Sequence, residues 1–153
     1  MKKILFILPN LKAGGAEKVF LNLINLLKDD VKIYLVVFDS SGLLKKIVPK
    51  KIQIIDLQTK RLRNSLFKIF YNIIKIKPNI ILSSLLHVNI YLLLLNLICI
   101  KKYNIILRET NFPYENVKRN RLLFFVYRYL YRLSNNIIAS SFSMKNHHQF
   151  CTS

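Results

Sequence analysis

Short apolar runs alternate along this chain with longer segments of helical period, and this alternation limits the possible folds more than any other feature. Residues 2–8 (KKILFIL) and 32–38 (KIYLVVF) are typical of buried strands. Between them, residues 15–28 have apolar side chains at helical spacing. A connection of this length commonly joins parallel strands. The pattern therefore predicts an α/β fold with an open, mostly parallel, Rossmann-like sheet flanked by helices.

The same alternation continues towards the end of the chain. Pro78 ends one helix, because the residue before a proline avoids the helical region. We expect the buried stripe of the first helix to consist of Val19, Phe20, Leu23, Leu26 and Leu27. Further strands are expected at 52–57, 79–83, 104–109 and 135–141, and further helices at 63–76, 87–99 and 117–133.

A single domain of residues 1–141 contains all these elements, and residues 142–153 form an irregular tail without an apolar period. The tail includes the adjacent His147 and His148, which would point apart on a regular element. A frayed terminus is therefore a better interpretation of the tail than a metal site. We expect no metal site in the chain.

Residues 79–100 form a run of 22 residues without a formal charge, which raises the alternative of a transmembrane helix. Six polar residues interrupt the run, and lysines flank it on both sides, so no charge asymmetry would orient a span. The β-branched start, the Ser-Ser pair and the leucine-rich part instead indicate a buried strand, a turn and a buried helix. Residues 2–8 resemble the start of a signal peptide, but the run is too short, and a buried strand is expected there.

Positive charge is concentrated in the second part of the chain. The net charge is +18, and residues 60–153 carry 15 Lys and Arg against 2 acidic residues. Such an excess indicates an anionic partner, which could be a membrane surface, a phosphorylated substrate or a nucleic acid. The hydrophobic fraction of 52% supplies a buried core and excludes a disordered chain.

The chain has three glycines, and two of them, Gly14 and Gly15, stand side by side between the first strand and the first helix. In an open α/β sheet this junction lies at the carboxyl edge, where the free N–H groups of a helix favour an anion. Glycine lets a phosphate approach the backbone closely. Glu17, in the first turn, suits the helix dipole and would help to cap the helix. The alternative is a plain tight turn that needs positive φ, and the spacing matches neither a P-loop nor a dinucleotide fingerprint.

Four segments occur in the order and register of one enzyme family: GGAEKVFLNLINLL, IKPNIILSSL, IILRETN and LSNNIIASS. Together they resemble the N-terminal domain of glycosyltransferases of the GT-B fold, and they are most similar to the retaining, nucleotide-sugar-dependent family four. The resemblance covers about residues 2–143. It implies that the sequence is the N-terminal, acceptor-side half of a GT-B architecture, with the C-terminal donor-binding domain absent.

The resemblance also implies roles for individual residues at two places. Many family members have a histidine near the end of the IILRE strand, and this chain has none there. The residues implied are Gly14 and Gly15 for the donor diphosphate, Glu109 and Asn111 for catalysis, and Arg108, Thr110 and Glu17 for the acceptor. The alternative for Arg108 and Glu109 is a local ion pair on a strand edge.

By the same resemblance, the reaction transfers a sugar from a UDP- or GDP-sugar to a hydroxyl of a glycan or lipid-linked acceptor in the synthesis of cell-surface polysaccharide. The anomeric configuration is retained. Backbone N–H groups and cations would stabilise the leaving-group charge, so no cofactor and no obligatory metal are expected. The isolated half is expected to hold a donor poorly. Our second hypothesis is a non-catalytic basic α/β module that binds a membrane or a polyanion, or an inactive truncated remnant.

Two rows of cations repeat at near-helical spacing and predict a membrane-facing surface. On helices this spacing places each row on one face, and cations beside Phe and Tyr suit a bilayer interface. We therefore expect a cytoplasmic protein that is peripheral to the inner face of the cell membrane. A solvated outer face is the alternative, and nucleic acid is not expected as a partner because no recognition motif is present. The rows are Arg61, Lys68 and Lys75, and Arg121, Arg128 and Arg132.

Overall fold

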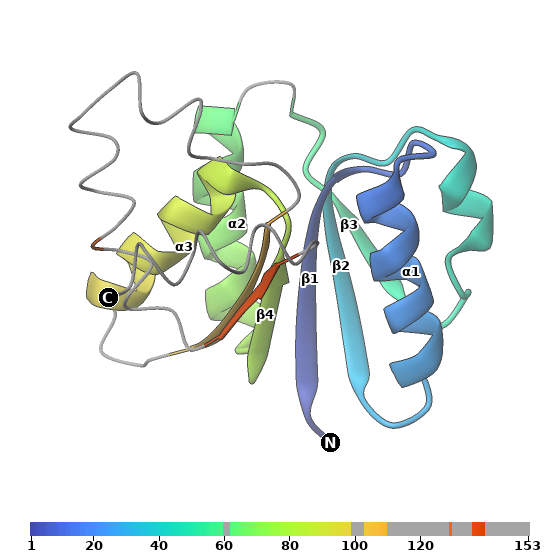
Figure 1. Ribbon diagram of the computed structural model, residues 1–153, viewed down its shortest axis with the longest axis horizontal. Helices are drawn as coiled ribbons and strands as arrows, with labels where there is room; N and C mark the ends of the chain where they lie inside the picture. The colour runs from blue at the N-terminus through green and yellow to red at the C-terminus, as the bar shows by residue number, and fades with distance from the viewer. Residues whose placement is uncertain (60–61, 99–102, 110–128, 130–135, 140–153) are drawn as a thin grey trace. The chain divides into compact units, whose positions relative to one another are not determined.

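The fold is seen in a computed structural model (Figure 1), which describes most of the first hundred residues and shorter stretches beyond them. The described residues are 1–59, 62–98, 103–109, 129 and 136–139. The chain divides into two compact units, Met1–Leu82 and Ser83–Ser153.

The first unit alternates strands and helices. Strand β1 leads through a short loop into helix α1, and a short 3₁₀ helix, η1, follows strand β2. Helix α2 then connects strand β3 to strand β4. The bounds are β1 Lys3–Asn10, α1 Gly15–Leu27, β2 Lys32–Asp39, η1 Leu43–Ile47, β3 Gln53–Asp56, α2 Leu62–Ile76 and β4 Ile80–Ser83.

The strands of the first unit lie in the order β3-β2-β1-β4. β1 pairs in parallel with β2, from Lys3 opposite Lys32 to Asn10 opposite Asp39, and β2 pairs in parallel with β3. Just before β4, the backbone N–H of Asn79 donates to the carbonyl of Lys3 at 2.9 Å, so β1 and β4 begin at the same edge. The expected parallel α/β architecture is therefore confirmed for this unit.

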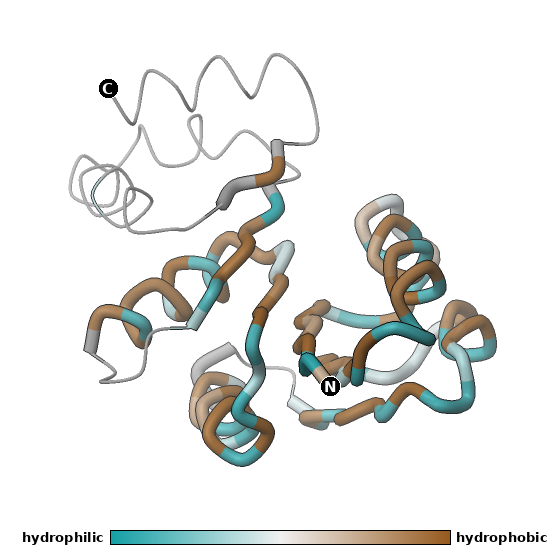
Figure 2. The backbone as a smooth tube through the Cα atoms, turned by 90° about the horizontal axis from the view of Figure 1, so that it is seen from below, coloured by the Kyte–Doolittle hydropathy of each residue, from teal (hydrophilic) through white to brown (hydrophobic). Residues whose placement is uncertain are grey.

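The core of the first unit consists of strands that are buried on both faces. Leu5, Phe6, Ile7 and Leu8 in the middle of β1 have no exposed surface, and the middle of β2 is equally covered. Such continuous apolar runs are expected where helices cover both sides of a parallel sheet. Because right-handed connections lead from β1 outward to β3 and then back to β4, α1 and α2 lie on opposite sides of the strands (Figures 1 and 2).

Helix α1 packs on the sheet through a different stripe from the one that the sequence predicts. Val19 and Leu26, which we expected in the core, are 48% and 77% exposed. The rings of Phe6 and Phe20 meet edge to face, with centroids 5.6 Å apart. The apolar residues of this helix span an arc of about 220°, which is wider than the buried stripe, so the helical period alone does not determine which part of the arc is buried. The buried residues are Glu17, Phe20, Leu21 and Ile24.

The second unit contains one complete helix and two parallel strands among its described residues. β5 pairs with β6 from Ile106 opposite Asn136 to Glu109 opposite Ala139. The side chain of Asn96 joins the end of the helix to the start of β5, since its Oδ1 accepts from Tyr103 N at 2.7 Å and its Nδ2 donates to Tyr103 O. The bounds are α3 Leu86–Ile98, β5 Asn104–Glu109 and β6 Asn136–Ala139.

Most predicted elements are confirmed within one or two residues, and the differences are local. β1 continues through Pro9 to Asn10, and η1 has no counterpart in the prediction. The strand, turn and helix expected in residues 79–99 are present as β4 and α3. Among the described residues, no helix has both the length and the apolar character needed to cross a bilayer. The predicted helix at 117–133, apart from the helical Tyr129, and the tail at 142–153 lie outside the described residues.

Candidate functional site

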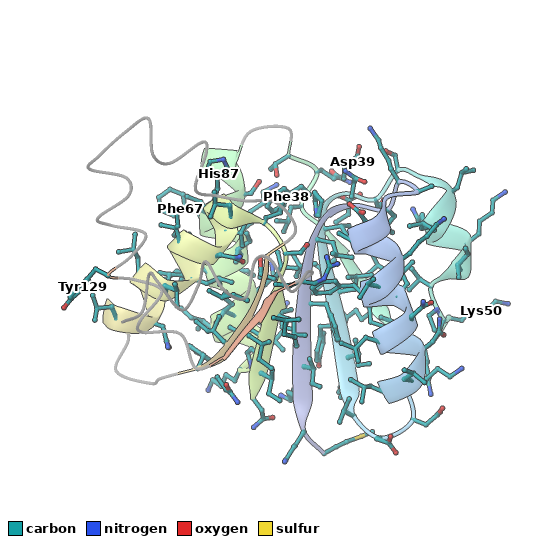
Figure 3. All side chains as sticks on the ribbon, viewed as in Figure 1. Phe38, Asp39, Lys50, Phe67, His87 and Tyr129 are labelled. Carbon is teal, nitrogen blue, oxygen red and sulfur yellow. The ribbon has the colours of Figure 1, made fainter. Side chains whose placement is uncertain are left out.

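The carboxyl ends of β1, β2 and β3 carry three loops at one edge of the first unit. In parallel sheets this edge is where ligands bind, because the loops and the starts of the following helices converge there. Asp39, labelled in Figure 3, closes β2 and marks this edge. The loops are 11–14 after β1, 40–42 after β2 and 57–59 after β3.

Neither glycine of the adjacent pair adopts positive φ. Gly14 is the N-cap of α1 with φ −83° and ψ 159°, which is ordinary extended backbone, and Gly15 is the first helical residue. The only glycine with positive φ among the described residues is Gly42, at 134°. The alternative of a plain tight turn that needs positive φ is therefore wrong for the pair.

The two glycines differ in what surrounds them. A Cβ atom on Gly14 would overlap Oε2 of Glu17, so Gly14 makes room for this largely buried carboxylate. A Cβ atom on Gly15 would meet no heavy atom within 4 Å. The first turn of α1 is therefore open to the outside at Gly15 and filled by Glu17 at Gly14.

The start of α1 presents unpaired backbone donors. The first bond into the helix runs from Lys18 N to Gly14 O at 3.2 Å. The N–H groups of Gly15, Ala16 and Glu17 have no hydrogen-bond partner among the described residues. No side-chain hydrogen bond caps this end, so the capping role that we expected for Glu17 is wrong. Three free donors at the positive end of a helix dipole favour an anion.

Gly42, in the loop after β2, packs against the loop of residues 11–14, which is called the glycine loop here. At its φ of 134°, a side chain would be strained, and a Cβ would overlap the carbonyl group of Leu11 and lie 2.7 Å from Lys12 N. Leu44 N donates to the same Leu11 carbonyl at 3.0 Å. Gly42 is not among the residues that were predicted for the site. The available signal was that it is the third of three glycines and follows a strand end.

Two aspartates at this edge order the loops. Asp39 accepts hydrogen bonds from the backbone N–H and the hydroxyl of Ser41, at 2.8 and 2.7 Å. Asp56 accepts from the backbone N–H of Ser40 and of Gln58, at 3.2 and 2.9 Å. Partial desolvation raises the pKa of Asp56, but hydrogen bonds from Ser40 and from the backbone lower it more, so the pKa lies below its ordinary value.

Both carboxylates therefore have local partners, and the described residues contain no group of three His, Cys, Asp or Glu side chains that could hold a metal ion. Positive charge is also present at this edge. Lys12 is exposed in the glycine loop, and Lys45 Nζ donates to the hydroxyl of Ser40 at 3.2 Å. The edge thus combines open helix donors with two lysines.

In the second unit, Arg108 lies near the end of β5. Its side chain is half-buried, and its Nη1 atom is buried without a hydrogen-bond partner among the described residues. A buried guanidinium nitrogen without a partner is costly, and an anionic or hydroxyl ligand would satisfy it. The backbone of Glu109 ends the strand, whereas its side chain, Thr110 and Asn111 lie outside the described residues. An ion pair between Arg108 and Glu109 therefore stays an untested alternative.

The structure brings together Gly14, Gly15 and Glu17 at the start of α1, and it places Arg108 and the backbone of Glu109 in the other unit. Lys68 and Lys75 lie on α2 as expected. The other four cations of the predicted rows, Arg61, Arg121, Arg128 and Arg132, lie outside the described residues.

Comparison with known proteins gives no match to a family model or to a curated protein.

Proposed function

We propose that this chain is the acceptor-side portion of a retaining glycosyltransferase of GT-B architecture. It takes part in the transfer of a sugar from a UDP- or GDP-sugar to a hydroxyl of a glycan or lipid-linked acceptor. The observation that carries the proposal is the open first turn of α1, where Gly15 meets no atom within 4 Å and three N–H groups have no partner among the described residues.

The diphosphate of the donor fits this turn for electrostatic reasons. Its oxygens are strong acceptors, and the N–H groups of Gly15, Ala16 and Glu17 are donors at the positive end of the helix dipole. Because Gly15 lacks a side chain, a phosphate can approach these donors directly. The same donors stabilise the charge that develops on the leaving nucleoside diphosphate, which assists cleavage of the sugar–oxygen bond.

The acceptor is proposed to bind at the end of β5. Arg108 supplies a guanidinium with a nitrogen that has no partner in the described part of the chain and can donate to a sugar hydroxyl or to a phosphate of a lipid-linked acceptor. Glu109 and Asn111 are the proposed catalytic residues, and Thr110 is a further proposed acceptor residue. A rigid strand end is a suitable support for such groups.

Nucleotide binding by the whole chain tests the proposal through two matched variants. Gly15→Asp places a carboxylate among the free donors, whereas Leu26→Asp places the same charge at an exposed position near the other end of α1. We expect Gly15→Asp to weaken binding of UDP and GDP at least about tenfold and Leu26→Asp to leave it nearly unchanged. Equal affinity of both variants and the wild type would refute the proposed diphosphate site.

The second hypothesis, a non-catalytic basic module, predicts a different result for the same variant. In an enzyme that includes a donor-binding domain, Gly15→Asp should abolish sugar transfer and leave lipid binding nearly unchanged. Transfer that survives Gly15→Asp would contradict the assignment of the glycine loop.

A further inference from the structure

Helix α2 exposes large hydrophobic side chains on the side that faces away from the core. Phe67 is 79% exposed, Tyr71 63% and Ile74 48%. The same helix buries three isoleucines, since Ile69, Ile73 and Ile76 are at most 6% exposed. Phe67, Tyr71 and Ile74 are called the outer stripe below, and Phe67 is labelled in Figure 3.

The outer stripe lies opposite the buried stripe of the same helix. At 100° per residue, Phe67, Tyr71 and Ile74 fall within about 60° of one another. Their mean direction is about 170° from that of Ser65, Ile69, Ile73 and Ile76, which are all buried. Packing of α2 on its own unit therefore gives the outer stripe no role.

Cations accompany the outer stripe, and acidic residues do not. Residues 60–77 contain six Lys and Arg and no Asp or Glu. Lys75 Nζ lies 5.8 Å from the centroid of the Tyr71 ring, so one cation sits directly beside the stripe. Lys68 is a second lysine of α2, and its Nζ donates to Leu57 O, in the loop after β3, at 2.6 Å.

We propose that the outer stripe of α2 docks on an anionic lipid bilayer. Aromatic rings such as Phe67 and Tyr71 are favoured at headgroup depth, Ile74 gains from contact with acyl chains, and Lys75 lies where it can meet lipid phosphates. The sequence predicted a basic face on this helix, whereas the exposed apolar residues beside it are a finding of the structure. This inference does not depend on sugar transfer.

The charge and the apolar residues together favour a bilayer over other occupants. A second copy of the chain would bring the cations of two α2 helices against each other, which costs free energy. A soluble polyanion would pair with the lysines but would leave Phe67 and Ile74 in water. An anionic bilayer satisfies both features at once.

Sedimentation of the whole chain with lipid vesicles tests this docking. The vesicles contain phosphatidylcholine alone or mixed with phosphatidylglycerol. We expect binding to the anionic vesicles and a loss of at least about tenfold in partitioning for Phe67→Ser combined with Tyr71→Ser. Lys75→Gln should weaken partitioning about fivefold, and high salt should weaken the binding of the wild type.

The matched control is Leu26→Ser, which removes an equally exposed apolar side chain from α1. It should partition like the wild type. Far-ultraviolet circular dichroism and thermal unfolding verify that all variants are folded, as expected for substitutions of exposed residues. The inference is overturned if the wild type does not bind anionic vesicles or if the double variant binds them as strongly as the wild type. It is also overturned if light scattering shows that the double variant abolishes only self-association.

Discussion

Replacing Gly42 by alanine should destabilise the first unit, although the change adds only one methyl group. Gly42 has a φ of 134° and a ψ of 160°, a region that glycine alone occupies readily. The added Cβ would also overlap the carbonyl group of Leu11, which is backbone and cannot rotate away. The loop that leads to the start of α1 would therefore have to move.

The size of the effect follows from two contributions. The backbone conformation costs a residue with a side chain about 1–3 kcal/mol. Displacement of Leu11 also breaks its hydrogen bond from Leu44 N, which contributes about 1 kcal/mol. We expect a loss of about 2–4 kcal/mol in the free energy of unfolding, which corresponds to a fall in Tm of roughly 5–15 °C for a chain of this size.

Urea and thermal unfolding of Gly42→Ala and Gly15→Ala provide the assay, because the two variants make the same chemical change in opposite surroundings. A Cβ on Gly15 meets nothing within 4 Å, and alanine is the better helix former, so Gly15→Ala should be unchanged or up to about 1 kcal/mol more stable. If Gly42→Ala is as stable as Gly15→Ala, the account of how the glycine loop is held is wrong.

Two further predictions concern the phase of α1 and the pH dependence of the carboxyl edge. Ile24→Ala should cost about 2–5 kcal/mol in urea unfolding, because Ile24 has no exposed surface, whereas Leu26→Ala should change stability by less than about 0.5 kcal/mol; equal effects would contradict the buried stripe. The folded-state pKa of Asp56 is lowered, so its contribution to stability is present above the ordinary value of 3.8 and is lost as pH falls through the lower folded-state value. Asp56→Asn should therefore lower the free energy of unfolding at neutral pH and make it decrease less at acidic pH, as measured by denaturant titration. A pH profile identical to that of the wild type would refute this prediction.

The strands and most helix bounds could be predicted because local sequence determines them. β2 is a run of apolar, largely β-branched and aromatic residues between charged ends, and α1 begins at the glycine pair and ends before Lys28 and two aspartates. The buried face of α1 could not be predicted, because the sheet covers Phe20, Leu21 and Ile24, which form only part of an apolar arc of about 220°.

The candidate site was predicted only in part, for a related reason. The pairing of Gly14 and Gly15 with a helix start is visible in the sequence, and the structure places it at the carboxyl edge. The role of Gly42 depends on contact with Leu11, which is 31 positions away in the chain and is brought near only by folding. The exposure of Phe67 and Tyr71 likewise depends on which face of α2 the sheet covers.

The most direct test of the central proposal is a residue-resolved NMR titration of the ¹⁵N-labelled chain with UDP, with uridine as the control. If the start of α1 binds a diphosphate, the amide signals of Gly15, Ala16 and Glu17 should shift with UDP and stay in place with uridine, and Gly15→Asp should suppress the shift. The proposed diphosphate site would be contradicted if UDP shifted other amide signals but not these three, or if uridine shifted these three signals equally.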